Sequence, residues 1–195
     1  MDEKEIIRRA KEGNRNALSE LVTLYSDRIY NLALRILRNR EDAEDVLQET
    51  FLTVVEKLNT FNEQSSFFTW IYRIATNASL MKIRKKKYSV RELPDHPDFN
   101  QLEVADWSQN PLDDVQNKEV KKLLDRAIGE LSDTYRSVFI LRDIEQLSIK
   151  ETAGILDISE ENVKIRLRRA RLFLREKLSQ YFTYEKAKSP SSKAN

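Results

Sequence analysis

The chain has 195 residues, and its 34 Lys and Arg nearly balance its 32 Asp and Glu, so the net charge of +2 must be examined segment by segment. The absence of Cys, a single His (His96) and only three Gly exclude disulfides, thiolate or multi-His metal sites and glycine-rich phosphate loops. No stretch approaches the roughly 20 apolar residues of a membrane helix, and the first residues lack the apolar core of a signal peptide. We therefore expect a soluble, cytoplasmic protein, and the composition argues against most classes of enzyme and against a bound cofactor or metal.

The four Pro residues divide the chain. Three lie between residues 94 and 111 and the fourth lies near the end, which leaves long Pro-free runs where continuous helices can form. Residues 92–117 hold seven acidic side chains and no Lys or Arg, a composition typical of an extended linker. We predict an all-α protein with two small helical domains at residues 1–91 and 118–182, an acidic linker at 92–117 and a disordered tail at 183–195.

Apolar residues at steps of three and four predict three helices in the first domain. The first spans about residues 18–37, the second follows from residue 43 to residue 58 with Asn39 as its N-cap, and the third runs from about residue 66 to residue 84. The predicted buried stripes are Leu18, Leu21, Val22, Tyr25, Ile29, Leu32, Ala33, Ile36 and Leu37; Ala43, Leu47, Phe51, Val54 and Leu58; and Phe67, Trp70, Ile71, Ile74, Ala75 and Ala78.

The second of these helices is acidic. Between residues 41 and 56 it has six acidic residues and no basic one. Its outer face presents Asp45, Gln48, Glu49 and Leu52, which would repel DNA but could contact a basic protein surface. A solubilising face is the alternative, and an exposed Leu52 favours a protein partner.

The third helix ends in a basic segment, since residues 82–91 hold six positive charges and no negative one. Such a segment can bind phosphates without reading a base sequence. The polar loop before this helix, within residues 61–68, is flanked by aromatic rings that suit unstacked single-stranded bases. The helical spacing of Phe67 and Trp70 places both in the core, whereas Phe61 fits the core and base stacking equally well.

The second domain contains a helix-turn-helix pattern. Helices are predicted at about residues 120–131 and 135–142. Ser148 and Glu151 then have the spacing of a capping box, and the helix that they begin ends near Leu156. After Asp157, which tolerates the left-handed conformation of a tight turn, Ser159 can cap the next helix.

The last helix carries seven basic and three acidic residues between positions 159 and 178. Its predicted core stripe is Val163, Leu167, Ala170, Leu174 and Leu178, and the parallel basic stripe is Lys164, Arg168, Arg171 and Arg175. On the second helix of a helix-turn-helix, Lys and Arg can bond guanine edges or phosphates in the major groove, and Ile165 could contact a thymine methyl. The alternative is a solvated helix partly neutralised by pairs such as Glu160 with Lys164.

The chain resembles bacterial sigma factors of the sigma-70 family in four runs, DAEDVLQETF (42–51), TWIYRIATN (69–77), YRSVFILRD (135–143) and VKIRLRRAR (163–171). The order and spacing of the runs resemble the extracytoplasmic-function (ECF) group. The resemblance implies that the first domain is region 2 and the second is region 4, with the linker in place of region 3. It also implies a protein that directs core RNA polymerase to promoters, has no chemistry of its own, and is bound by an anti-sigma factor.

The resemblance further implies roles for individual residues. The acidic face, Asp45, Gln48, Glu49 and Leu52, would bind the coiled-coil clamp helices of the polymerase β′ subunit, and the β flap is a second implied contact. The minus-ten box would be opened, and a flipped base captured, by Phe61, Asn62, Ile74 and Asn77, with Lys82, Arg84 and Lys85 on the DNA backbone. The minus-thirty-five box would be read by Lys164, Ile165, Arg168 and Arg169, with Arg142, Arg166 and Arg171 on phosphates. The linker would lie in the RNA exit path, and a simple acidic tether is the alternative.

Three other functions remain open at this point. A stand-alone helix-turn-helix regulator that dimerises on DNA and never joins polymerase would leave the acidic face unused. A helical adaptor would use its basic faces to bind acidic proteins. A Mg²⁺-dependent nucleic-acid enzyme would need convergent carboxylates, which an outward-facing acidic helix does not supply.

Overall fold

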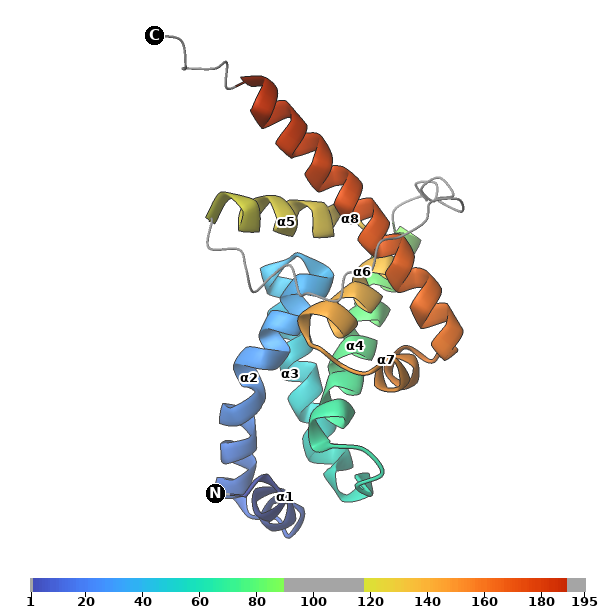
Figure 1. Ribbon diagram of the computed structural model, residues 1–195. Helices are drawn as coiled ribbons and strands as arrows, with labels where there is room; N and C mark the ends of the chain where they lie inside the picture. Colours follow the sequence, from blue (N-terminus) through green and yellow to red (C-terminus); the bar gives the residue numbers. More distant parts are fainter. Residues whose placement is uncertain (1, 90–117, 189–195) are drawn as a thin grey trace. The chain divides into compact units, whose positions relative to one another are not determined.

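The computed structural model describes residues 2–89 and 118–188, with side chains described at 2–86 and 122–179. Every element in these ranges is helical, as predicted (Figure 1). Contacts divide the chain into two compact units, residues 1–93 with 150–158 and residues 94–149 with 159–195, and each unit is described by itself. The predicted linker, and residues 189–195 of the predicted tail, lie outside the described residues.

The first unit is built mainly from the N-terminal helices. These are α1 (Glu3–Lys11), α2 (Arg15–Leu37), α3 (Arg40–Lys57) and α4 (Phe67–Ser89), with a 3₁₀ turn, η1 (Leu58–Thr60), directly after α3. The three predicted helices are α2, α3 and α4, and the predicted cap is confirmed, because the Asn39 side chain accepts a hydrogen bond from the Asp42 amide at 2.9 Å. The sequence pattern does not predict α1, whose apolar residues span barely two turns.

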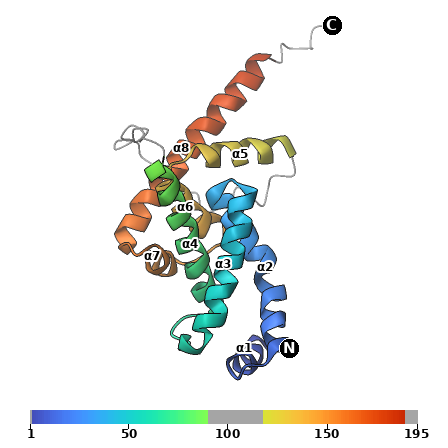
Figure 2. The same cartoon turned by 180° about the vertical axis from the view of Figure 1, so that it is seen from behind.

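The core of this unit lies between α2, α3 and α4, which run side by side, with α1 at one end of α2 (Figure 1, Figure 2). Most of the predicted stripes are buried, including Leu21, Ile29 and Ile36 of α2 and Ile71 of α4. Val22 is a correction, since it is 38% exposed. It lies one residue, about 100° around the helix, from Leu21, at the margin of the stripe that the neighbouring helices cover.

A hydrogen bond between side chains fastens α1 to α2. The Tyr25 hydroxyl of α2, a buried residue, donates to the Glu3 carboxylate of α1. Burial, and then this hydrogen bond, raise the pKa of Tyr25 above its usual value. Ile6, Ile7 and Ala10 bury the apolar side of α1, so its attachment does not depend on a single contact.

The second unit contains α5 (Lys118–Glu130), α6 (Asp133–Phe139), the π-helical turn η2 (Ile140–Ile144) and α8 (Glu160–Lys188). Its core includes Leu124, Leu131, Val138, Leu141, Val163, Ala170 and Leu174. Arg136 joins α5 to α6, since its guanidinium donates to the backbone carbonyls of Ile128, Gly129 and Leu131 and pairs with Asp133 at 3.1 Å. The half-buried Arg136 therefore satisfies carbonyls at the end of α5 that would otherwise lack donors.

Two helices of this part of the chain differ from their predicted bounds. The helix predicted through residue 142 changes to π-helical geometry at Ile140, where the Glu145 amide donates to the Ile140 carbonyl at 2.9 Å, five residues back. The last helix, α8, continues to Lys188, so the start of the predicted disordered tail, residues 183–188, is helical. A periodicity of 3.6 does not reveal a π turn, and the polar composition after residue 183 concealed the helix.

Candidate functional site

The outer face of α3 presents the four residues that the sequence predicted for a protein partner. Asp45, Gln48, Glu49 and Leu52 are all exposed, and Leu52 is 66% exposed. They follow each other at helical spacing, while Ala43, Val46 and Val54 bury the opposite side of α3 in the core. The structure therefore brings acidic, amide and apolar groups together on one open helical face.

Ion pairs connect this face to α4. The Lys82 ammonium of α4 pairs with Asp45 and lies 3.5 Å from the Asp42 carboxylate, and Lys86 pairs with the other Asp42 oxygen. Burial raises the pKa of Asp42, but the hydrogen bond and charge of Lys86, with those of Lys82, outweigh it and leave the pKa below its usual value. The hydrogen bond to Asp45 holds the pKa of Lys82 above its usual value. Lys82, predicted for the DNA backbone, is thus bonded to α3 carboxylates in this structure.

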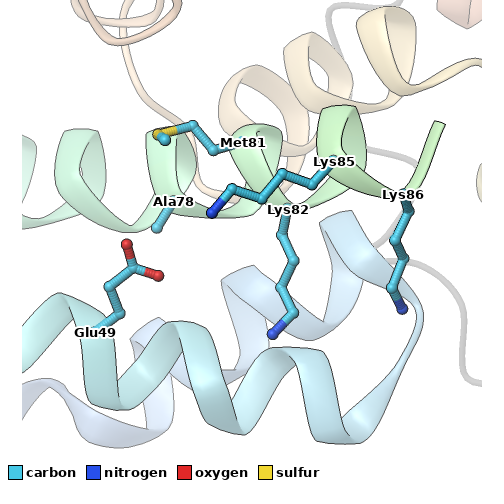
Figure 3. A pocket seen from close by; sticks show the side chains of 6 residues that line it. All are labelled: Glu49, Ala78, Met81, Lys82, Lys85 and Lys86. Carbon is cyan, nitrogen blue, oxygen red and sulfur yellow. The ribbon is translucent and has the colours of Figure 1, made fainter. Parts of the chain in front are cut away.

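A pocket of about 330 Å³ opens beside these pairs, lined by Glu49, Ala78, Met81, Lys82, Lys85 and Lys86 (Figure 3). Figure 3 shows Lys82 and Lys86 reaching from α4 towards α3, while the Lys85 side chain extends along α4 towards Glu49. The exposed thioether of Met81 gives the pocket an apolar side between charged groups. The pocket therefore belongs to the same surface as the acidic face and can accept a side chain that is apolar along its length and charged at its tip.

The loop between η1 and α4 has exposed polar side chains and begins next to Phe61, whose ring packs against other aromatic rings. Residues 62–66 are exposed, but Phe61 is only 5% exposed. Its ring lies 5.3 Å from the Trp70 ring and 5.5 Å from the Phe67 ring, centroid to centroid. In this structure Phe61 is part of the core, and its stacking on a base stays a prediction.

Along α4, the predicted DNA-binding residues differ in exposure. Asn77, Arg84 and Lys85 are exposed, whereas Ile74 is half-buried. Arg73 is also exposed and lies four residues before Asn77, on the same face of α4. Arg73 is not among the residues predicted from the sequence, although its spacing from Asn77 is a signal that could have found it.

In the second unit, the N-terminal half of α8 carries an exposed basic face. Lys164 and Arg168 are exposed, and Ile165 between them is 41% exposed. Lys164 lies 3.8 Å from Glu161, a distance typical of a weak surface ion pair, so it can turn to another anion at little cost. These are the side chains of the predicted base-reading set that face solvent.

Other arginines predicted to contact DNA are engaged within the second unit. Arg171 makes a two-pronged ion pair with Asp143, with both N–O distances 2.8 Å, and Arg169 donates to the Tyr135 hydroxyl at 3.2 Å. The half-buried Arg142 donates to the Leu147 carbonyl. In this structure the guanidinium groups of Arg142 and Arg171 hold η2, its following turn and α8 together, and their predicted contacts with DNA phosphates stay predictions. Arg166 is partly exposed.

The turn between α7 (Ile149–Leu156) and α8 has the geometry that the sequence predicted. Asp157 adopts the left-handed conformation with φ of 54°, and the Ile158 amide donates to the Ala153 carbonyl at 3.1 Å. The Ser159 hydroxyl accepts from the Asn162 amide at 3.2 Å, which confirms Ser159 as the N-cap of α8. α7 begins directly after Ser148, its predicted cap position.

Comparisons with protein families and known proteins agree with this arrangement. The family description "Sigma-70 region 2" matches residues 21–88, and "Sigma-70, region 4" matches residues 121–174. The chain is 36% identical over 187 residues to the ECF RNA polymerase sigma factor SigW of Bacillus subtilis, covering 90% of this chain and 96% of that protein. It is 29% identical over 176 residues to the ECF RNA polymerase sigma-E factor of Escherichia coli K12, covering 85% and 88% of the two chains.

Solved structures share the fold at lower identity. The complex of CnrH with the cytosolic domain of CnrY aligns with a TM-score of 0.63 at 23% identity, covering 91% of this chain and 97% of that one. The sigma factor RpoE of Bartonella quintana, solved with the anti-sigma factor NepR, aligns with a TM-score of 0.61 at 21% identity, covering 83% and 96%. No helix in the described part of the chain has the length and hydrophobicity required to span a bilayer.

Proposed function

Because the chain belongs to the sigma-70 family of RNA polymerase sigma factors, in its ECF group, we propose which of its surfaces carries out each step of promoter-directed initiation. The protein is a transcription initiation factor that binds RNA polymerase and directs it to specific promoters. The match to both regions of the family, on both sides of the acidic segment, carries this conclusion. It disfavours a helix-turn-helix regulator that acts without polymerase, which would need the second region alone.

We assign polymerase binding to the acidic face of α3. Asp45, Gln48, Glu49 and Leu52 combine negative charge with an exposed apolar side chain, which suits a basic helical partner such as the β′ clamp helices. The open pocket beside Glu49 extends this surface towards Met81. Leu52 supports docking best, because Val55, three residues further along α3, is also exposed and the two form an apolar area beside the acidic groups.

We assign minus-ten recognition and strand opening to the loop and outer face of α4. Asn62 and Asn77 supply exposed amides that can bond base edges, and Ile74 supplies an apolar edge beside them. Arg73, Arg84 and Lys85 supply positive charge for the DNA backbone. Phe61 and Lys82 are left out of this set because both are engaged within the unit.

We assign minus-thirty-five recognition to the N-terminal half of α8. Lys164 and Arg168 can bond guanine edges or phosphates, and Ile165 can contact a thymine methyl. Arg166, Arg169 and Arg175 lie on the same helix, and their positive charge favours duplex DNA over the length of the face. Residues 1–91 and 118–182 would act as regions 2 and 4, with 92–117 as the tether along the RNA exit path.

Three further assignments follow from family membership. The protein would act in the cytoplasm, as a factor without a catalytic site, because polymerase carries out the chemistry. Its β flap contact would be made by the second domain. An anti-sigma factor would hold it inactive by covering apolar side chains exposed in the first unit, of which Leu52 and Val55 on α3 and Met81 on α4 are examples.

Run-off transcription with purified core polymerase and a promoter library tests the docking assignment. We would compare the native chain with Glu49→Lys and Leu52→Asp, and leave Asp45 intact because its loss would also free Lys82. Leu24→Asp is the matched control, since Leu24 is 47% exposed on α2 and away from the acidic face. Specific transcripts that depend on the native chain, survive Leu24→Asp and fail with both α3 variants would support the assignment.

Two results would contradict it. Unchanged transcription with both α3 variants would remove polymerase binding from this face. Promoter binding by the chain alone, with affinity that polymerase does not alter, would instead favour a stand-alone regulator.

A further inference from the structure

One lysine of α1 contacts the start of the loop that precedes α4. The Lys11 ammonium donates to the Phe61 backbone carbonyl at 2.6 Å, and the same nitrogen lies 5.2 Å from the centroid of the Phe61 ring. Lys11 is half-buried, so a charged hydrogen bond there is screened less than one on the open surface. The two groups are fifty residues apart in sequence and meet only because α1 lies beside η1.

Phe61 is fixed on its other sides as well. Its ring packs edge-on against Phe67 with an interplanar angle of 82°, and at 42° against Trp70. Phe67 in turn packs edge-on against Tyr25 of α2, with centroids 5.3 Å apart. These rings hold the Phe61 side chain, whereas the contact from Lys11 is the one that holds its backbone carbonyl.

The loop that follows, residues 62–66, is short and internally ordered. Glu63 has a left-handed φ of 59° although it is not glycine, and the Asn62 side chain accepts from the Gln64 amide at 3.4 Å. At its far end the Ser66 hydroxyl accepts from the Thr69 amide at 3.1 Å, which starts α4. The loop is therefore fixed at both ends, while its side chains face solvent.

We propose that Lys11 is a positioning residue for minus-ten recognition, which sets the orientation of Asn62 by holding the carbonyl of the preceding residue. This inference rests on the proposed function of the loop. The peptide plane between Phe61 and Asn62 includes the carbonyl that Lys11 binds and the backbone nitrogen of Asn62, so a rotation of that plane changes the φ of Asn62, on which the direction of its side-chain amide depends. A base-reading group must be held to about 0.5 Å, which a surface loop achieves only when other residues anchor it.

The attachment of α1 does not require Lys11. Ile6, Ile7 and Ala10 are buried, and the hydrogen bond from Tyr25 to Glu3 holds the opposite end of the helix. Lys11 is the last residue of α1, so its side chain can be shortened without opening the core. Lys11 also lies before the segment that matches region 2, residues 21–88, so the matched region alone does not contain this anchor.

Base selectivity at the minus-ten box is the measurement that tests this role. The protein is bound to core polymerase and offered a promoter library randomised in that box, and the ratio of preferred to rejected sequences is compared among variants. Lys11→Met removes the charge and the donor but keeps an apolar stem, Lys11→Arg restores both, and Lys4→Met is the control on the exposed side of α1. Loss of one charged hydrogen bond predicts a roughly tenfold fall in selectivity for Lys11→Met.

The inference is supported if Lys11→Met lowers selectivity, Lys11→Arg rescues it, and Lys4→Met leaves it unchanged at equal polymerase affinity. It is overturned if the native chain selects a minus-ten sequence and Lys11→Met selects it equally well. Failure of the native chain to initiate at all would contradict the proposed function instead. If Lys11→Met also weakens polymerase binding, a second measurement decides whether Lys11 orders the loop. NMR order parameters of the backbone amides at residues 62–65 are then compared between Lys11→Met and Lys4→Met in the chain without polymerase. Equal values in the two variants overturn the proposal.

Discussion

The two units carry positive charge in physically different ways. In the first unit, Lys82 and Lys86 bind carboxylates of the neighbouring helix α3, and the partners Asp45 and Lys86 are largely open to solvent. In the second unit, Arg171 binds Asp143 through two hydrogen bonds in a pair that is mostly covered. Lysine pairs that have one open partner exchange more readily for other anions than a planar, two-pronged arginine pair whose two members are both half-buried.

This difference distinguishes basic side chains that can leave their carboxylate for a phosphate from basic side chains that hold the fold together. Lys82 remains able to leave Asp45 when a phosphate approaches, so its ion pairs reduce its availability without removing it. Arg171 would leave Asp143 uncompensated if it turned to DNA, and that cost exceeds what one phosphate contact returns. At the start of α8, Lys164 and Arg168 are exposed, and we expect them to contribute DNA-binding charge together with the other basic residues of this helix.

The largest effect is expected when the arginine pair is broken. Arg171→Ala should lower the free energy of unfolding of the second unit by about 2–3 kcal/mol, because it removes two charge-assisted hydrogen bonds and leaves Asp143 without them. Urea titration followed by circular dichroism measures the change. Lys164→Ala, on the exposed face of the same helix, is the control and should change stability little. Equal stability of Arg171→Ala and the native chain would place Arg171 back among the DNA contacts.

Substitution of Arg168 is expected to weaken DNA binding, unlike substitution of Arg171, which is expected to lower stability. Arg168→Ala should weaken binding of the polymerase complex to the upstream box about tenfold, with selectivity relaxed at one position, if this side chain bonds a base edge. Fluorescence anisotropy with duplexes that differ at single positions gives the measurement. A uniform loss across all duplexes would reassign Arg168 to a phosphate.

The ion pairs of Asp42 should give a stability that depends on pH. Because the folded-state pKa of Asp42 is lowered below its usual value, folding favours the charged form, and this contribution is fully present only at a pH well above the unfolded-state pKa. Asp42→Asn should cost about 1 kcal/mol near neutral pH. The difference from the native chain should disappear as the pH falls through the lowered pKa. Urea titrations across this range measure it, with the exposed Asp27→Asn as the control, and a difference that persists at low pH would argue for a packing role instead.

The smallest expected effect is a difference between Arg84 and Lys82 in the salt dependence of promoter binding. Arg84→Ala should reduce the slope of log affinity against log salt by about 0.9 if Arg84 neutralises one phosphate. Lys82→Ala should reduce the slope by less, since DNA binding by Lys82 must first break its pairs with Asp42 and Asp45. Promoter binding at several salt concentrations measures both. Equal slopes for the two variants would show that the ion pairs do not compete with DNA.

The helices and caps were largely predictable from sequence because their signals are local. The long apolar repeat of α2, the Asn39 cap and the left-handed Asp157 each depend on residues within a few positions of one another. The π turn at Ile140 and the end of α8 were not predicted, because a turn of five residues is too short to alter a periodicity detectably and the last residues of α8 are mostly polar. Val22 was misplaced because one residue at the margin of a stripe can face either way.

The sequence predicted which residues lie on the candidate site, but not which partners their side chains contact in the fold. The exposed face of α3 follows from periodicity, which places Asp45 and Leu52 on one side. Periodicity places a side chain on a face of its own helix but does not show which partner meets it there. The pairs of Lys82 with Asp45 and of Arg171 with Asp143 join residues far apart in the chain, so they emerge only in the fold. The anchor from Lys11 to Phe61 has the same long range.

The bonds that tie α8 to η2 and α6 also bear on modularity. A recognition helix is often treated as a cassette that carries its specificity when it is transplanted between relatives. Here the face that we assign to DNA recognition and the face that holds Arg169 to Tyr135 and Arg171 to Asp143 belong to the same few turns. A chimera that exchanges α8 alone would separate each arginine from its acceptor, so the smallest transferable segment runs from Tyr135 onward and includes the π turn that orients Asp143.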